Sequence, residues 1–188
     1  TDYAKNKDKT NGGELVSSYE CNPQTVDSEF ALSKSEYLQN TGRVIKGDII
    51  AYQIRQSFKP GEITPEEANK VGYETAMRWT KGNHAFIVAT HIDREHIHNH
   101  IIYNSTDLSC QRKFRDFFFC GIALQRVSDL VCLENGLSVI TPRKPSERDR
   151  RTEYPKRIKY RDLIKEDINT CMSKYPKGME NLFQLLEE

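Results

Sequence analysis

All five histidines of this chain lie between positions 84 and 100, and four of them fall within ten residues. Side chains alternate between the faces of a β-strand, so His98 and His100 share one face. A short turn after His91 would bring that histidine opposite them on a neighbouring strand. Three neutral imidazoles suit a divalent transition metal and leave positions open for water or substrate. The spacing therefore predicts a metal site on a hairpin, whereas a solvated strand edge does not account for so many histidines.

The other polar residues around this motif allow more than one role. His96 lies on the face of the predicted ligands but nearer the turn, where it would contact phosphate, support a ligand or simply be exposed. Asp93 would accept a hydrogen bond from a ligand imidazole or take the proton from a nucleophile, unless it is an ordinary turn residue. Asn104 would either hydrogen-bond at the strand end or bind phosphate. His84, at the far end of its strand, is expected to be structural.

A three-histidine metal ion has two common uses, activating a water molecule or polarising a carbonyl or phosphoryl oxygen. Metal-dependent hydrolases often carry a glutamate beside their ligands, as in H-E-x-x-H, and the sequence lacks that motif. The other route is a side-chain nucleophile that attacks a phosphate held at the metal. A nuclease that uses activated water is kept as the alternative.

The histidine motif resembles one specific family. Residues 90–105 (THIDREHIHNHIIYNS) are similar to the third motif of conjugative relaxases, the mobilisation nucleases of the His-hydrophobic-His endonuclease class. In that family a histidine, an aspartate two residues later and an H-x-H hold one divalent ion. The resemblance implies His91, His98 and His100 as ligands and gives Asp93 its place in the motif. The implied ion is Mn or Mg, although imidazole ligands also suit Zn, Co and Ni.

A second segment resembles the next relaxase motif. Residues 50–62 (IAYQIRQSFKPGE) are similar to the motif whose "SF-x-P-G-E" serine contacts DNA. The resemblance gives that role to Ser57. Histidine is common in the family where Gln53 stands, so the role of this position stays open.

The N-terminal segment resembles the first motif of the family, in which a tyrosine is the nucleophile. The sequence reads DYAKNKDKT from Asp2, so the resemblance implies Tyr3 as the nucleophile, with Tyr19 as the alternative. The chain starts with Thr1 rather than Met, and we expect its N-terminus to be trimmed and an upstream strand to be missing. The three motifs stand in relaxase order and cover roughly residues 1–140.

The resemblance also implies a reaction. A tyrosine oxygen attacks the scissile phosphate of single-stranded DNA and leaves a 5′-phosphotyrosine bond and a free 3′-hydroxyl, which allows later rejoining. Asp93, His96 and a metal-bound hydroxide are all candidates to accept the phenol proton. The implied setting is an origin of transfer during conjugative mobilisation in the bacterial cytoplasm. Its partners are single-stranded and hairpin DNA, an accessory DNA-binding protein and a coupling protein. A rolling-circle replication initiator is the nearest alternative.

Basic residues near the motifs are candidate DNA contacts. Those that flank the predicted site in sequence are Arg55, Lys59, Arg112, Lys113 and Arg115. The last three accompany Phe114 and Phe117, a combination that would neutralise and stack on a strand, although we expect the phenylalanines to pack in the core. The segment 143–161 holds nine Lys and Arg against three acids and would either track phosphates or serve as a solvated linker.

The composition fits a globular chain with one ordinary core. It has 188 residues, 37% of them hydrophobic, and its formal net charge of +1 excludes a globally basic nucleic-acid binder. Five cysteines without a C-x-x-C indicate reduced thiols. No apolar run reaches the ~18–20 residues of a membrane span, and no signal peptide is visible.

Periodicity and turn signals predict an α+β fold, with helices on one side of an antiparallel sheet and further helices at the C-terminus. The predicted strands are 47–56, 84–91, 97–104 and 137–140, and the predicted helices are 27–40, 64–80, 114–134, 160–173 and 177–187. The second helix has the strongest start, because Thr64, Pro65 and Glu67 suit a capping box. We expect a catalytic domain at 1–140, a basic linker or arm at 141–159 and a helical extension at 160–188.

Overall fold

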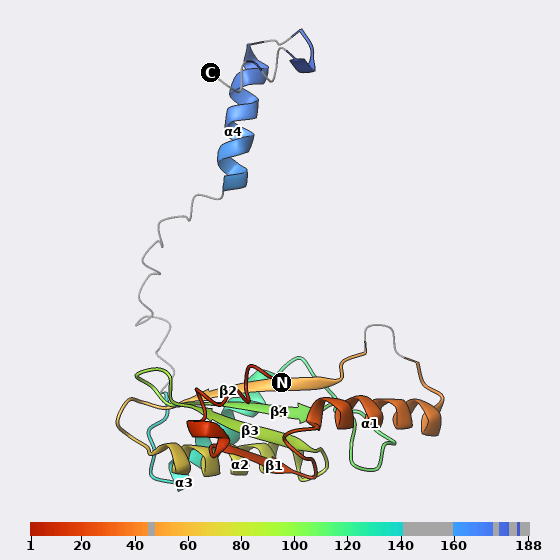
Figure 1. The fold of residues 1–188 in the computed structure, drawn as a ribbon, viewed down its shortest axis with the longest axis vertical. Helices are drawn as coiled ribbons and strands as arrows, with labels where there is room; N and C mark the ends of the chain where they lie inside the picture. Colours follow the sequence, from red (N-terminus) through yellow and green to blue (C-terminus); the bar gives the residue numbers. More distant parts are fainter. Residues whose placement is uncertain (45–47, 141–159, 175–176, 181–183, 185–188) are drawn as a thin grey trace. The chain divides into compact units, whose positions relative to one another are not determined.

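Four strands form one antiparallel sheet in this computed structural model, which describes residues 1–44, 48–140, 160–174, 177–180 and 184 (Figure 1). The strands are β1 (Val16–Tyr19), β2 (Ala51–Ser57), β3 (Phe86–His91) and β4 (His98–Asn104), in the spatial order β1-β3-β4-β2. The predicted hairpin is confirmed, because β3 and β4 pair antiparallel with His91 opposite His98. β1 was not predicted, since its sequence VSSY is short and half serine.

Two helices cover one face of the sheet, which confirms the α+β prediction (Figure 1). α2 (Pro65–Thr80) begins with the predicted capping box, in which Thr64 and Glu67 each accept the other's backbone N–H. Gly72 lets α2 approach the sheet closely, because a Cβ there would overlap the side chains of Asn99 and Val88. α3 (Cys120–Glu134) packs beside α2.

The core under α2 also contains a polar network centred on Asn99 of β4. The Nδ2 of this fully buried residue donates to Gln56 Oε1 at 3.1 Å and to the Ala68 carbonyl at 2.6 Å. Its Oδ1 accepts the Thr90 hydroxyl at 2.7 Å. Both N–H groups and the oxygen of the amide are therefore paired within the fold.

The opposite face of the sheet is covered mainly by the N-terminal segment (Figure 1). A small apolar cluster lies there, in which Ala4 packs with Ile87 and with Val26 and Phe30 of α1. α1 (Val26–Thr41) confirms the predicted helix 27–40. This face carries His91, His98 and His100, so the N-terminal segment is held directly against these three histidines.

The predicted helix 114–134 is too long at its start, since α3 begins only at Cys120. The backbone N–H of Phe114 donates to the Ser105 carbonyl at 2.6 Å, and its ring packs against Tyr103. These contacts hold the segment alongside the end of β4, which prevents a helical turn there.

The predicted strand 137–140 is wrong, and β2 begins at Ala51 rather than at residue 47. Ser138 is held by Glu62, whose carboxylate accepts its backbone N–H and its hydroxyl. Leu137 packs with Val131 in a core cluster. Side-chain contacts therefore fix this segment without a strand partner.

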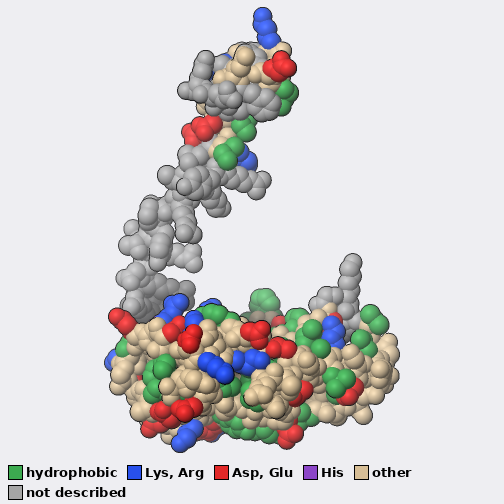
Figure 2. Space-filling view, in the orientation of Figure 1, with side chains coloured by type: hydrophobic (Ala, Val, Ile, Leu, Met, Phe, Trp, Pro, Cys, Tyr) green, Lys and Arg blue, Asp and Glu red, His purple; other side chains and the backbone are tan. Residues whose placement is uncertain are grey.

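The chain divides into two compact units, residues 1–140 and 141–188. In the second unit, α4 (Tyr160–Ser173) matches the predicted helix 160–173. The predicted linker 141–159 and most of the predicted helix 177–187 lie outside the described residues. Within the described part, no helix has the length and apolar character to cross a membrane. The visible face of the first unit intersperses acidic, basic and apolar side chains, in keeping with a net charge near zero (Figure 2).

Candidate metal centre and nucleophile

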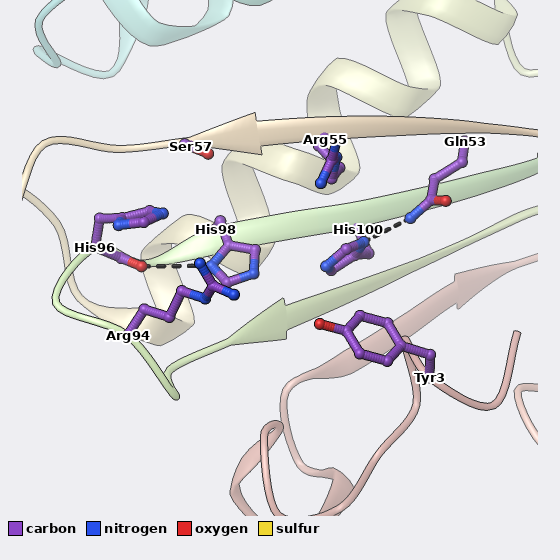
Figure 3. A pocket seen from close by; sticks show the side chains of 8 residues that line it. All are labelled: Tyr3, Gln53, Arg55, Ser57, Arg94, His96, His98 and His100. Carbon is purple, nitrogen blue, oxygen red and sulfur yellow. Dashed lines mark hydrogen bonds between the residues drawn. The ribbon is translucent and has the colours of Figure 1, made fainter. Parts of the chain in front are cut away.

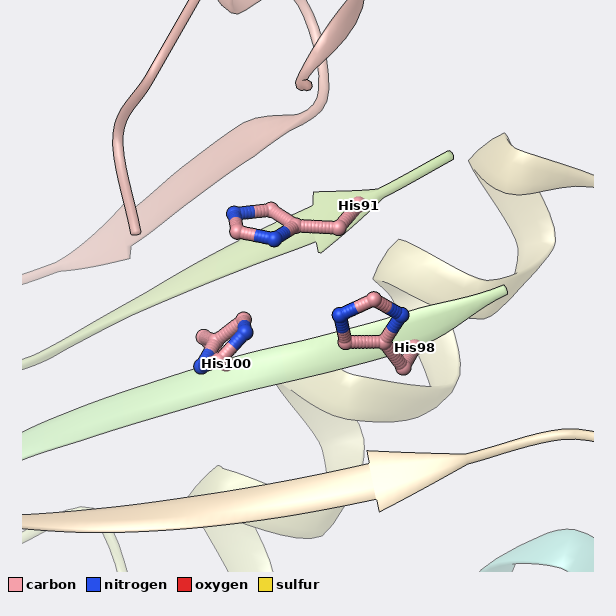
Figure 4. A group of neighbouring side chains, drawn as sticks. All are labelled: His91, His98 and His100. Carbon is pink, nitrogen blue, oxygen red and sulfur yellow. The ribbon is translucent and has the colours of Figure 1, made fainter. Parts of the chain in front are cut away.

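Three histidine side chains from β3 and β4 point toward one another (Figure 4). His91 lies opposite His98 across the antiparallel ladder, and His100 follows two residues later on the same face of β4. All three residues are buried, and one nitrogen of each ring lies within 4.8 Å of the others. The register of the hairpin thus brings the predicted ligands together.

Hydrogen bonds orient two of these rings and leave one nitrogen of each unpaired. His91 Nε2–H donates to the Ala4 carbonyl at 2.9 Å, and His100 Nδ1 lies 2.6 Å from the Gln53 amide. With that amide turned so that its oxygen accepts Nδ1–H, His100 Nε2 carries the free lone pair. Among the described residues, His91 Nδ1 and His100 Nε2 are buried without a partner. Buried polar atoms are nearly always satisfied, so these two nitrogens, which lie in one cluster, are suited to binding a ligand.

The charge state of the cluster also suits a metal ion. Burial lowers the pKa of His98. Burial and the nearby charges of His91, His98 and Arg55 lower the pKa of His100 to about 4. Both rings are therefore neutral near pH 7, which is the state that coordinates a cation. The residues present fit one divalent ion with three imidazole ligands.

Tyr3 lies against the histidines, and its phenol oxygen points into the pocket (Figure 3). Its ring centroid is 5.5 Å from that of His91 and 5.6 Å from that of His100. Lys9 Nζ donates to the phenol oxygen at 3.2 Å. The Tyr3 side chain is 58% exposed, so a substrate can reach it. The structure thus brings the predicted nucleophile beside the predicted ligands, with a cation on its oxygen.

Asp93 binds the same lysine instead of an imidazole. Its carboxylate lies 2.8 Å from Lys9 Nζ. Hydrogen bonds to Asp93 and Tyr3 raise the pKa of Lys9, and the bond from Lys9 lowers the pKa of Asp93, so both groups are charged near neutral pH. The expectation that Asp93 orients a ligand imidazole is not met, because Ala4 and Gln53 occupy those positions.

An open pocket of about 570 Å³ lies beside the cluster (Figure 3). Its lining residues are Tyr3, Gln53, Arg55, Ser57, Arg94, His96, His98 and His100. Arg55 and Ser57 of β2 lie opposite the two ligands of β4. His96 lines the pocket but stands outside the group of three ligands. Lys59 is exposed just beyond Ser57 and does not line the pocket.

Two predicted site residues lie away from this pocket. Tyr19 stacks on Phe86 with ring centroids 5.3 Å apart, and its hydroxyl donates to a backbone carbonyl. About five residues of strand, or ~17 Å, separate that position from His91, so Tyr19 lies far from the three clustered histidines. Asn104 is buried, and its side-chain oxygen accepts the Thr106 N–H. It stabilises the chain after β4 and cannot contact DNA there.

The basic residues that follow β4 also lie elsewhere. Arg112, Lys113 and Arg115 line a second cleft together with His84. His84 precedes His91 by about seven residues, roughly 23 Å of extended chain. These three residues therefore do not flank the metal centre as expected. His84 is held by two backbone carbonyls, in agreement with its expected structural role.

Sequence reasoning missed three polar residues at this site: Lys9, Gln53 and Arg94. Lys9 is one of several lysines in the first motif, and only the folded contacts distinguish it. Gln53 stands where histidine is common in the family, so its role stayed open and its contact with His100 was not predicted. Arg94 had one signal, its place next to Asp93 in the turn.

Comparisons with known proteins agree with this geometry. Residues 3–137 match the family described as "Relaxase: MobA/VirD2-like, nuclease domain". Protein rlx of Staphylococcus aureus is 33% identical over 184 residues, which cover 93% of this chain and 55% of that protein. The group II intron-interrupted relaxase LtrB of Lactococcus lactis is 30% identical over 200 residues, which cover 89% of this chain and 36% of that protein. No solved structure matches the chain significantly.

The chain therefore spans about half, or less, of the length of these relatives. The family match covers all three motifs and confirms the resemblance drawn from them. This chain belongs to the MobA/VirD2-like relaxases, and residues 3–137 form the nuclease domain of that family.

Proposed function

We propose that this chain nicks a single DNA strand by transferring a backbone phosphate to Tyr3. One observation carries the proposal. The phenol lies against His91 and His100, and its oxygen binds the Lys9 ammonium. A tyrosine in the fold for packing alone would not need an exposed ring and a charged partner on its oxygen.

The three histidines would hold one divalent ion. When bound, the ion would withdraw charge from the non-bridging oxygens of the scissile phosphate and orient that group. Imidazole ligands favour Mn, Co, Ni or Zn over Mg by chemistry, and Mn or Mg is the ion expected for the family. Ala4 and Gln53 would keep the rings of His91 and His100 oriented toward the ion.

In the proposed step the Tyr3 oxygen forms a bond to phosphorus, and the bond from phosphorus to the 3′ oxygen breaks. The phenol loses a proton and the departing 3′ oxygen gains one, which yields a 5′-phosphotyrosine and a 3′-hydroxyl. Lys9 would stabilise the negative charge that develops on the phenol oxygen, which makes it a catalytic residue. Within the described part of the chain only Lys9 hydrogen-bonds to that oxygen, so Asp93 would act through the lysine.

The remaining pocket residues would bind the DNA strand. Arg55 and Arg94 would neutralise phosphates, and Ser57 and His96 would donate hydrogen bonds to them. Action at an origin of transfer rests on the family and on the relaxase name of a relative. The same basis supports hairpin DNA, an accessory DNA-binding protein and a coupling protein as partners.

The test is a denaturation-resistant adduct between the protein and a labelled oligonucleotide that carries its cognate sequence, in the presence of Mn²⁺. We expect an adduct with the native chain and none with Tyr3→Phe. Lys9→Met should slow adduct formation by roughly 100-fold, while Lys9→Arg restores most of the rate. Cleavage without an adduct would instead support the nuclease that uses activated water, and an unchanged rate in Lys9→Met would remove Lys9 from the catalytic residues.

A further inference from the structure

A second cleft, of about 690 Å³, lies at the end of the sheet remote from the metal centre. The end of α2 and the segment between β4 and α3 form its walls. We call it the distal cleft and define it by Trp79, Lys81, Arg112, Phe114, Arg115 and Phe117. Trp79 and Phe114 also pack on the core cluster of the α2 face, which is the face opposite the histidines. The distal cleft is thus separate from the catalytic pocket in both position and face.

The distal cleft carries cations that the fold leaves uncompensated. Lys81, Arg112 and Arg115 are exposed and have no hydrogen bond or ion pair from their side chains to other described residues. The acid in the lining, Asp107, has its carboxylate occupied by backbone N–H groups and by Ser109. The cleft therefore presents positive charge to an anionic ligand.

Phe117, which lines the distal cleft, begins a run of three exposed phenylalanines. Phe117, Phe118 and Phe119 are 46%, 94% and 61% exposed, and the last two rings lie 4.9 Å apart. Three consecutive exposed phenylalanines are unusual on a folded surface and indicate a surface that a partner covers. Unpaired nucleobases stack on such rings in any sequence, and their phosphates match the neighbouring cations.

We infer that the distal cleft is a second binding site for single-stranded DNA. This inference rests on the proposed function in one respect, that DNA is the substrate. Lys81, Arg112 and Arg115 hold phosphates, and the rings of Phe117–Phe119 stack on bases. A duplex does not fit this chemistry, because paired bases hide their faces within the helix. A purely apolar protein segment would leave the cations without partners.

Trp79 is the single tryptophan of the chain and lines the distal cleft, so its fluorescence reports on occupancy. The experiment titrates Tyr3→Phe protein with (dT)12 in EDTA, so that neither cleavage nor the metal centre contributes. We expect saturable quenching that weakens as salt is raised. Arg112→Ala/Arg115→Ala and Phe117→Ala/Phe118→Ala should each raise Kd at least about fivefold.

The matched control is Lys70→Ala/Arg126→Ala, which removes the same charge from exposed positions of α2 and α3 outside the cleft. It should change Kd less than twofold. Absence of quenching, or equal losses in the control and the cleft variants, would overturn the inference, as would quenching by a duplex of the same length. If the native chain forms the adduct but DNA causes no quenching, only this inference is wrong. If DNA causes quenching but no adduct forms, only the proposed nicking reaction is wrong.

Discussion

The two faces of β4 treat buried polar groups in opposite ways. Beneath α2, Asn99 has both N–H groups and the oxygen of its amide paired. One residue further on, His100 turns to the other face and keeps its Nε2 buried and unpaired, as His91 keeps its Nδ1. An unpaired buried group costs about 1–3 kcal/mol, so β4 bears a cost at His100 that it avoids at Asn99. The contrast distinguishes Asn99, whose side chain stabilises the fold, from His100, which we propose as a metal ligand.

The largest effect should come from His100→Leu. The substitution removes one of the three proposed imidazole ligands, so Mn²⁺ affinity measured by calorimetry should fall more than about 100-fold. In EDTA the same variant should keep its free energy of unfolding within about 1 kcal/mol, because Nε2 has no partner in the fold and the Gln53 amide, which loses its bond to Nδ1, is on an exposed residue that water can hydrate. A large loss of stability without metal would show that His100 stabilises the fold, as Asn99 does on the other face of β4.

Asn99→Leu is the matched substitution on the adjacent residue. It leaves Gln56, Ala68 and Thr90 without their buried partner, so the free energy of unfolding in urea should fall by about 2–4 kcal/mol with or without metal. At a temperature where the variant is folded, its Mn²⁺ affinity should be near normal. Loss of metal binding by Asn99→Leu without a loss of stability would contradict the structural role of Asn99.

Gln53→Leu should have a smaller effect, because it removes a partner of a ligand and not a ligand. Without the hydrogen bond to Nδ1, the His100 ring loses its fixed tautomer, and Mn²⁺ affinity should fall about 10–100-fold. Gln53→Glu keeps an acceptor oxygen and should bind at least as well as the native chain. Equal affinity in the native and Leu proteins would show that His100 needs no orienting partner.

Acidification should have the smallest effect. The pKa values of His84, His98 and His100 all lie below their ordinary value near 6.5, because burial disfavours the charged form. Below about pH 6.5 the unfolded chain therefore takes up protons that the folded chain does not, and stability falls as pH falls toward about 4. Thermal melts in EDTA should show that the free energy of unfolding falls by roughly 1–3 kcal/mol over this pH range. The loss should be smaller in His100→Leu. A melting temperature that is flat over this range would contradict these shifts.

The hairpin and its ligands could be predicted from sequence because their information is local. A short turn places His98 opposite His91, and alternation along β4 puts His100 on the same face two residues later. The start of α2 could be predicted for the same reason, since its capping box lies within four residues.

The predictions that were wrong concern residues whose contacts are distant in sequence. The partner of Asp93 is Lys9, more than 80 residues away in the chain, and no pattern around either residue indicates it. Arg112 and Arg115 follow the motif closely in sequence, yet the length of β4 carries them to the other end of the sheet. The start of α3 was misplaced because Phe114 packs against the sheet, which local helix propensity does not register.

The hydrogen bond between His91 and the Ala4 carbonyl links the histidine cluster to the segment that carries Tyr3. Ala4 directly follows Tyr3, so the backbone that carries the proposed nucleophile also accepts a hydrogen bond from a proposed metal ligand. By reciprocity, an ion that holds His91 in place also restrains Tyr3, and a displaced Tyr3 weakens the hold on the ion. Once a strand is attached to Tyr3 and draws it from its resting position, the protein should release its metal more readily than before.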